Sequence, residues 1–196
     1  MNDSVQSVDP ETCFLTLDEF ARLFEVLISR GYEVIGPTID QEAIVYGQLS
    51  SIDDLPRGWT DQQEPGKYRL VRRDDNALFG YVVGPSSWKK QLFPPVSTLA
   101  RADRTEEGWQ FQEAKEETPR YAFLGVRACE LAAMKIQDRV FTGGPYVDSI
   151  YEQRRSQALV IAVNCTQAAS TCFCTSMETG PRCKAGFDLA LTELPD

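Results

Sequence analysis

The chain has 196 residues, with 20 Lys and Arg against 29 Asp and Glu, six cysteines and no histidine. A chain of this length buries a sizeable core without covalent cross-links, so size alone does not call for the cysteines. Without histidine, Ser-His-Asp and Cys-His nucleophiles are excluded, and sulfur or oxygen must hold any metal. The formal charge of −9 argues against nucleic acid and anionic membranes as partners.

The first twelve residues, MNDSVQSVDPET, have neither the basic nor the apolar segment of a signal peptide. No segment approaches the roughly 18 apolar residues of a membrane span. We therefore expect a cytoplasmic protein, in which clustered cysteines bind metal more often than they form disulfides.

The amino-terminal residues predict a capped helix followed by strands. Thr16 and Glu19 form a capping-box pattern, and apolar residues then recur at helical spacing until Gly31. Short β-type segments follow at 32–39 and 42–49.

The middle of the chain predicts a hairpin and short elements. A connection rich in Pro, Gly and Asp covers 52–66, and the segments KYRLVRR and LFGYVVG flank Asp74-Asp75-Asn76, which predicts a hairpin. GPSSWKKQLFPP predicts one or two helical turns, and GWQFQEA predicts an edge strand.

The second half predicts a strand–helix–strand crossover. YAFLGV at 121–126 and ALVIAV at 158–163 are short apolar segments typical of buried parallel strands. Between them, ELAAMKIQDRVF predicts a helix whose apolar face is Leu131, Met134, Ile136 and Val140. We expect an α/β fold with a mixed sheet: a parallel crossover in the second half and antiparallel hairpin elements in the first. An amino-terminal α+β part (1–100) and a cysteine-bearing α/β part (120–196) would form one compact unit.

Four cysteines are predicted to share one edge of this sheet. Cys129 follows the first parallel strand and Cys165 follows the second, and the carboxyl ends of parallel strands lie on one side. Cys172 and Cys174 lie on the loop that begins at Cys165. The helix that begins near Cys129 would point its positive end at this site, and Arg127 would add a cation.

Four thiolates suit either a cubane iron-sulfur cluster or a tetrahedral zinc. One residue separates Cys172 from Cys174 and six separate Cys165 from Cys172, whereas zinc knuckles usually have two to four. This spacing favours a cluster, with zinc and metal-free thiols left open. Cys183 would replace Cys129 as a ligand if the crossover were wrong, and Cys13 is expected to be an isolated thiol.

Several motifs resemble a known family. FLGVRACELAAMKIQDRVF, NCTQAASTCFCTSMETGP and GFDLALTEL resemble the iron-sulfur (beta) subunit of sulfhydrogenase, also called hydrogenase/sulfur reductase, and the related A subunit of anaerobic sulfite reductase. The family pattern is close to G-V-R-x-C-D, a cysteine after the next strand, C-F-C-x-S-M-x-T-G-P and G-x-D-x-x-L-T. The residues that match it are Cys129, Cys165, Cys172, Cys174, Ser176, Met177, Gly180 and Pro181. GPSSWKKQLFPP is similar to the family's G-P-x-x-x-K-x-x-L-F-P-P.

The sequence departs from the family in two places. Glu130 stands where the family usually has Asp, and the ferredoxin-like part with two further sets of four cysteines is missing. The chain therefore resembles the amino-terminal domain, either excised or as a short relative.

The resemblance implies a non-catalytic electron-transfer subunit of an oxidoreductase complex, with one [4Fe-4S] cluster on Cys129, Cys165, Cys172 and Cys174. Its implied partners are other subunits of a redox complex, including a ferredoxin-like or flavin-bearing one. Two other hypotheses remain open: a structural or assembly module with zinc or free thiols, and a thiol-disulfide regulator that uses Cys172 and Cys174.

Overall fold

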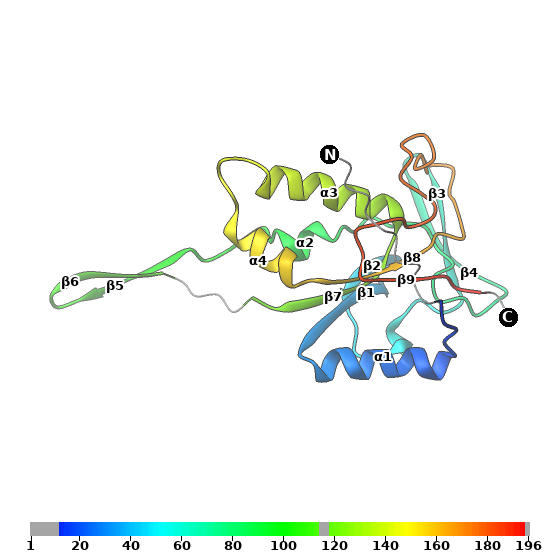
Figure 1. The fold of residues 1–196 in the computed structure, drawn as a ribbon, viewed down its shortest axis with the longest axis horizontal. Coiled ribbons are helices and arrows are strands. Elements are labelled where there is room, and N and C mark those ends of the chain that lie inside the picture. Colours follow the sequence, from blue (N-terminus) through cyan, green and yellow to red (C-terminus); the bar gives the residue numbers. More distant parts are fainter. Residues whose placement is uncertain (1–11, 114–117, 195–196) are drawn as a thin grey trace, which may run out of the picture.

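A five-stranded mixed sheet lies between two helical layers (Figure 1). The computed structural model of the chain describes residues 12–113 and 118–194. The elements in chain order are α1 Leu17–Ser29, β1 Tyr32–Asp40, β2 Ala43–Gln48, η1 Ile52–Asp54, β3 Trp59–Glu64, β4 Lys67–Arg72, α2 Lys89–Leu92, β5 Ala100–Thr105, β6 Gly108–Glu113, β7 Arg120–Val126, α3 Ala128–Thr142, α4 Ser149–Gln157, β8 Leu159–Val163 and β9 Leu189–Leu191. Among these residues, no helix is both long and apolar enough to cross a membrane.

The sheet order is β2-β1-β7-β8-β9, with β1 and β2 antiparallel and β1, β7, β8 and β9 parallel. This confirms the predicted α/β class, the parallel crossover and the presence of antiparallel hairpins. The sheet takes strands from both the amino-terminal and the carboxy-terminal halves of the chain. It therefore connects the two halves through main-chain hydrogen bonds.

The two faces of the sheet bury separate apolar clusters. On one face α1 packs Phe20, Phe24 and Leu27 against Val34 and Tyr81. On the other face α3, α4 and the segment around α2 bury a cluster that includes Trp88, Leu92, Leu131, Met134 and Tyr151. Burial of this much apolar surface on both faces is the dominant stabilising term in such a fold.

The predicted cap of the first helix is confirmed. Glu19 N donates to Thr16 Oγ1 at 3.3 Å, and Thr16 N donates to the Glu19 carboxylate at 2.8 Å. These two bonds satisfy main-chain donors that the first turn would otherwise leave unpaired. The short helix α2 also falls within the segment that predicted it.

The predicted hairpin between 67–73 and 78–84 is wrong. Strand β4 pairs instead with β3, which lies inside the predicted connection at 52–66, and Glu64 is opposite Lys67. The two-residue turn is Pro65-Gly66, where Gly66 has φ +74°. Proline followed by a glycine of positive φ favours such a tight turn, so the strands pair across it. Residues 78–84 form no strand.

Two further elements differ from the predictions. The predicted edge strand β6 pairs with β5 in a separate two-stranded hairpin, which extends away from the sheet and exposes Trp109 and Phe111 (Figure 1). The crossover contains a second helix, α4, that the sequence did not predict. Of the apolar face predicted for α3, Leu131 and Met134 are buried but Ile136 and Val140 are exposed. Ile136 and Val140 point elsewhere because their spacing from Leu131 does not match the helical turn.

Candidate metal centre

Cys129 is the second residue of α3, directly above the end of β7. The strand ends at Gly125 and Val126, where φ is +91° at Gly125 and the pairing with β8 shifts register. A side chain at Gly125 would meet Pro37 at 3.2 Å, so glycine fits both the backbone and the space. The chain then turns into α3, and its first turn brings Cys129 to the sheet edge.

Cys165, Cys172 and Cys174 lie on one loop, residues 164–188, which connects β8 to β9. Main-chain bonds hold its two limbs together: Cys165 N donates to Pro181 O at 3.2 Å, and Thr179 N donates to Cys174 O at 2.9 Å. As predicted, Cys129 and Cys165 follow the carboxyl ends of the neighbouring parallel strands β7 and β8.

The loop and the start of α3 meet at Gly180. An ideal Cβ on Gly180 would lie 3.3 Å from Cys174 Sγ and 3.6 Å from Ala128 Cβ, so Cys174 lies beside the first turn of α3. Burial, together with negative charges at Glu130, Cys174 and Cys165, raises the pKa of the Cys129 thiol to about 11. Three of the predicted cysteines thus share one electrostatic environment.

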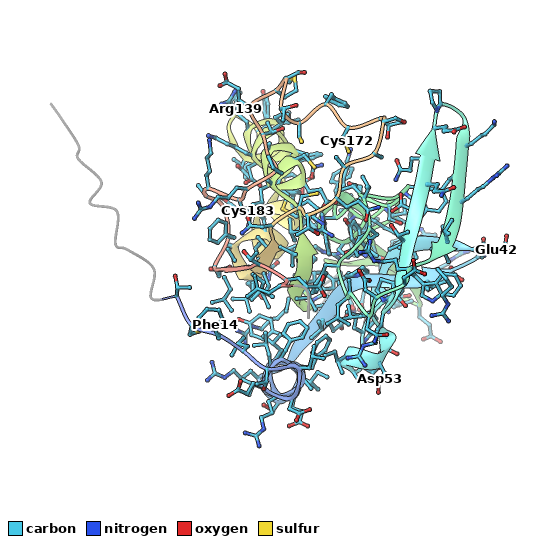
Figure 2. The ribbon with its side chains drawn as sticks, turned by 90° about the vertical axis from the view of Figure 1, so that its right-hand side faces the viewer. Phe14, Glu42, Asp53, Arg139, Cys172 and Cys183 are labelled. Carbon is cyan, nitrogen blue, oxygen red and sulfur yellow. The ribbon has the colours of Figure 1, made fainter. Side chains whose placement is uncertain are left out.

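Cys172 lies on the same loop but is exposed, whereas Cys129, Cys165 and Cys174 are half-buried. Figure 2 shows its loop between α3 and the β3–β4 hairpin. The main-chain N–H of Ala169 donates to Cys172 Sγ at 3.4 Å. The other two cysteines differ: Cys183 is buried, and Cys13 is exposed near the amino end of the described chain.

Arg127 places a positive charge below the cysteine site. Its guanidinium donates to Phe79 O at 2.7 Å, Tyr81 O at 3.3 Å and Asn164 O at 3.2 Å, and the side chain is 1% exposed. Burial lowers the pKa of Arg127, but Tyr81 and Cys165 raise it, and the net direction is upward. Arg127 is therefore a permanent cation that also ties the ends of three segments together.

Glu130 lies in the first turn of α3, and both of its carboxylate oxygens accept hydrogen bonds. Arg127 N donates to Glu130 Oε2 at 2.9 Å, and Tyr46 Oη donates to Glu130 Oε1 at 2.6 Å. Burial raises the pKa of Glu130. Tyr46 also stacks on Trp88, with ring centroids 3.8 Å apart, so the carboxylate is tied to the core.

The β3–β4 hairpin anchors the cysteine loop from the amino-terminal half. Gln167 Nε2 donates to Thr60 Oγ1 at 2.7 Å, Ser170 Oγ donates to Gln63 O at 3.0 Å, and Arg73 Nη1 donates to Gln167 Oε1 at 2.7 Å. These partners are about 100 positions apart in sequence, and no local motif signals them. The supporting contacts of Arg73 and Gln167 and the Tyr46–Glu130 hydrogen bond were therefore not predicted from the sequence.

The cysteines fit a metal group by chemistry but do not form a closed shell of ligands. Within residues 12–113 and 118–194, no three or more Cys, Asp or Glu side chains are arranged to hold a metal ion. What the structure does contain is Cys129 beside the loop that carries Cys165, Cys172 and Cys174, a buried cation that acts on Cys165, and a main-chain N–H directed at the Cys172 sulfur. These are donors and supporting groups that an anionic thiolate cluster requires.

Sulfhydrogenase 2 subunit beta of Pyrococcus furiosus is 36% identical to the chain over 163 residues, which is 83% of this chain and 40% of that protein. The chain thus spans about 40% of the length of this curated relative. No protein-family model matches the chain, and no solved structure matches it. The similarity extends over both halves of the fold and includes more than the cysteine segment.

Proposed function

Because the chain is a sulfhydrogenase beta-subunit-like polypeptide, we propose that it is an electron-transfer component of an oxidoreductase complex that holds one [4Fe-4S] cluster. The proposed ligands are Cys129, Cys165, Cys172 and Cys174. The proposed partners are other subunits of that complex, including a ferredoxin-like or flavin-bearing one.

The observation that carries the proposal is that Cys174 lies beside the first turn of α3, which carries Cys129, and that Cys174 and Cys165 both act electrostatically on the Cys129 thiol. Thiolates this close repel one another unless a positive group lies between them. Iron would remove that repulsion, and Cys172 would complete the set by a movement of its exposed loop. A bound cluster would supply one-electron redox chemistry.

Two features of the chain would stabilise the charged site. The Arg127 guanidinium is buried and acts electrostatically on Cys165, and the Ala169 N–H donates to the Cys172 sulfur. Positive charge and N–H donors near the sulfurs favour the more reduced, more negative state, which raises the reduction potential. Arg127 acts through position and charge, without touching a substrate.

Anaerobic reconstitution of the full chain with iron and sulfide tests the proposal. We expect about four irons and four sulfides per chain, an absorption band near 400 nm that bleaches on reduction, and an EPR signal in the reduced state. Each of Cys129→Ser, Cys165→Ser, Cys172→Ser and Cys174→Ser should lower iron content, while Cys13→Ser, on an exposed cysteine outside the site, should not.

The alternatives predict different results. One tightly bound zinc and no iron would favour a structural module. A fast-reacting Cys172 or Cys174 thiol in a metal-free protein would favour a thiol-disulfide regulator. A folded chain that takes up no iron, or whose iron content is unchanged by Cys172→Ser, would overturn the cluster proposal.

A further inference from the structure

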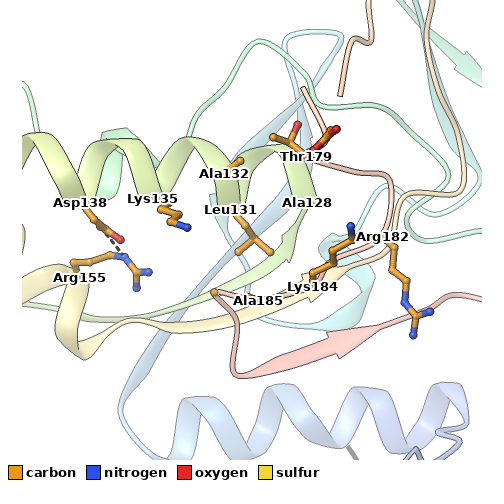
Figure 3. A pocket seen from close by; sticks show the side chains of 12 residues that line it. Ala128, Leu131, Ala132, Lys135, Asp138, Arg155, Thr179, Arg182, Lys184 and Ala185 are labelled. Atoms are coloured by element: carbon orange, nitrogen blue, oxygen red, sulfur yellow. Dashed lines mark hydrogen bonds and ion pairs between the residues drawn. The ribbon is translucent and has the colours of Figure 1, made fainter. Parts of the chain in front are cut away.

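A pocket of about 430 Å³ lies along α3, beside the cysteine site but distinct from it (Figure 3). Its apolar part is formed by Leu131 and Ala132 of α3 and by Ala185 of the long loop. This volume is within the range of small-molecule sites. Ala128 and Thr179 also line it, which places the pocket next to Cys129 and Cys174 without including either sulfur.

The pocket carries positive charge in an acidic chain. The cations that line it are Lys135, Arg155, Arg182 and Lys184, and the carboxylates are Asp138 and Glu178. The formal charge of the lining is therefore 4 minus 2, or +2, whereas the whole chain has a formal charge of −9. Arg155 is already paired with Asp138 at 3.1 Å.

The other three cations are available to a ligand. Lys135, Arg182 and Lys184 are exposed, and none of them makes an ion pair or a hydrogen bond with another side chain in the part of the chain that the structure describes. Exposed cations that line one pocket and lack internal partners are free to pair with an external anion. Lys135 comes from α3 and the other two from a loop almost 50 residues later, so the fold alone assembles the group.

From this combination we propose that the pocket binds a small organic phosphate about the size of a mononucleotide. The phosphate would be bound by Lys135, Arg182 and Lys184, and the apolar body of the ligand would pack on Leu131, Ala132 and Ala185. An inorganic anion would leave the apolar part of the pocket uncovered, and an uncharged molecule would leave the cations unpaired. The proposal does not depend on a bound cluster.

Isothermal titration of the full, anaerobically purified chain tests this with three probes: adenosine 5′-monophosphate, adenosine and inorganic phosphate. We expect the monophosphate to bind with a stoichiometry of one, and at least about tenfold more tightly than adenosine or phosphate, because each of these lacks one set of contacts. Its affinity should fall as salt is added. Equal affinity for phosphate and the monophosphate would overturn the proposal, as would no binding at millimolar concentration.

Matched substitutions locate the site. The double variant Lys135→Gln/Lys184→Gln should weaken binding of the monophosphate by about tenfold or more, whereas Lys90→Gln, at an exposed residue of α2, should leave it unchanged. Ala132→Leu should block the apolar part of the pocket, whereas Ala133→Leu, at the next residue of the same helix but outside the pocket, should not. Binding that survives Ala132→Leu and the double lysine variant would place the ligand elsewhere. Iron content measured on the same samples separates this result from the cluster test.

Discussion

Gly180 packs directly against Cys174, since a Cβ added to Gly180 would lie 3.3 Å from both Cβ and Sγ of that cysteine. The same position is 3.6 Å from Ala128 Cβ, at the start of α3. A side chain at residue 180 would therefore crowd Cys174, while its distance from α3 would be an ordinary van der Waals contact.

Gly180→Ala should displace the Cys174 side chain from its position beside the first turn of α3. The added methyl group is closer to sulfur than ordinary van der Waals contact allows, and the flexible cysteine side chain is the group that moves. We expect iron content after reconstitution to fall several-fold, with little change in the melting temperature. Gly144→Ala is the control, because nothing lies within 4 Å of a Cβ there. Iron content that is equal in the two variants would contradict the expectation.

Cys183→Ala should lower stability without lowering iron content. Cys183 is 6% exposed, its main-chain N–H donates to Asn164 Oδ1 at 2.8 Å, and its sulfur packs in the core. Removing a buried sulfur of this size should cost about 1–2 kcal/mol in the free energy of unfolding, measured by urea denaturation. A loss of iron equal to that in Cys174→Ser would instead make Cys183 a ligand.

Tyr46→Phe isolates one hydrogen bond to Glu130. The phenylalanine ring keeps the stack on Trp88 but removes the hydroxyl that donates to Glu130 Oε1 at 2.6 Å. Leaving a buried carboxyl with one donor fewer should destabilise the chain by about 1–2 kcal/mol in urea unfolding. Tyr146→Phe, at a tyrosine that is 90% exposed, should have no measurable effect.

The Arg73–Asp75 pair predicts a pH dependence below pH 4. Two hydrogen bonds from Arg73, each 2.6 Å, lower the pKa of Asp75 from 3.8 to about 2, and a bond from Ala77 N contributes. Because this pKa is lower in the folded state, the stabilisation is complete above pH 3.8 and disappears as pH falls toward 2. The difference in unfolding free energy between the wild type and Asp75→Asn should shrink over this range. A difference independent of pH would argue against the pair. Asp75 is exposed, so the effect is expected to be small.

The crossover was predictable because its strands carry a strong signal. YAFLGV and ALVIAV are apolar on both faces, and parallel strands then fix the positions of Cys129 and Cys165. Strand β3 was not predicted because its sequence TDQQE lacks the alternation of apolar and polar residues typical of a strand. The Pro65-Gly66 pair that follows it could have indicated a tight turn between two strands. Residues 79 and 81 looked like a strand, but they are buried and their carbonyls accept hydrogen bonds from Arg127.

The supporting residues of the site could not be predicted. Arg73 meets Gln167 across 94 positions, and Lys135 and Lys184 line the same pocket only because the loop returns to α3. Such pairs depend on tertiary packing, and neither residue type nor spacing marks them in a single sequence.

The hydrogen bonds between the cysteine loop and β3 set the order in which parts of this chain can fold. Residues from Thr60 to Pro181 must all have left the ribosome before the loop can adopt its bonds to β3 and its own closing bond. A local zinc knuckle can bind metal on a growing chain and fold around it. Here Cys129 lies beside the cysteine loop only through tertiary packing, so the proposed cluster would be inserted only after residues 60–181 have folded.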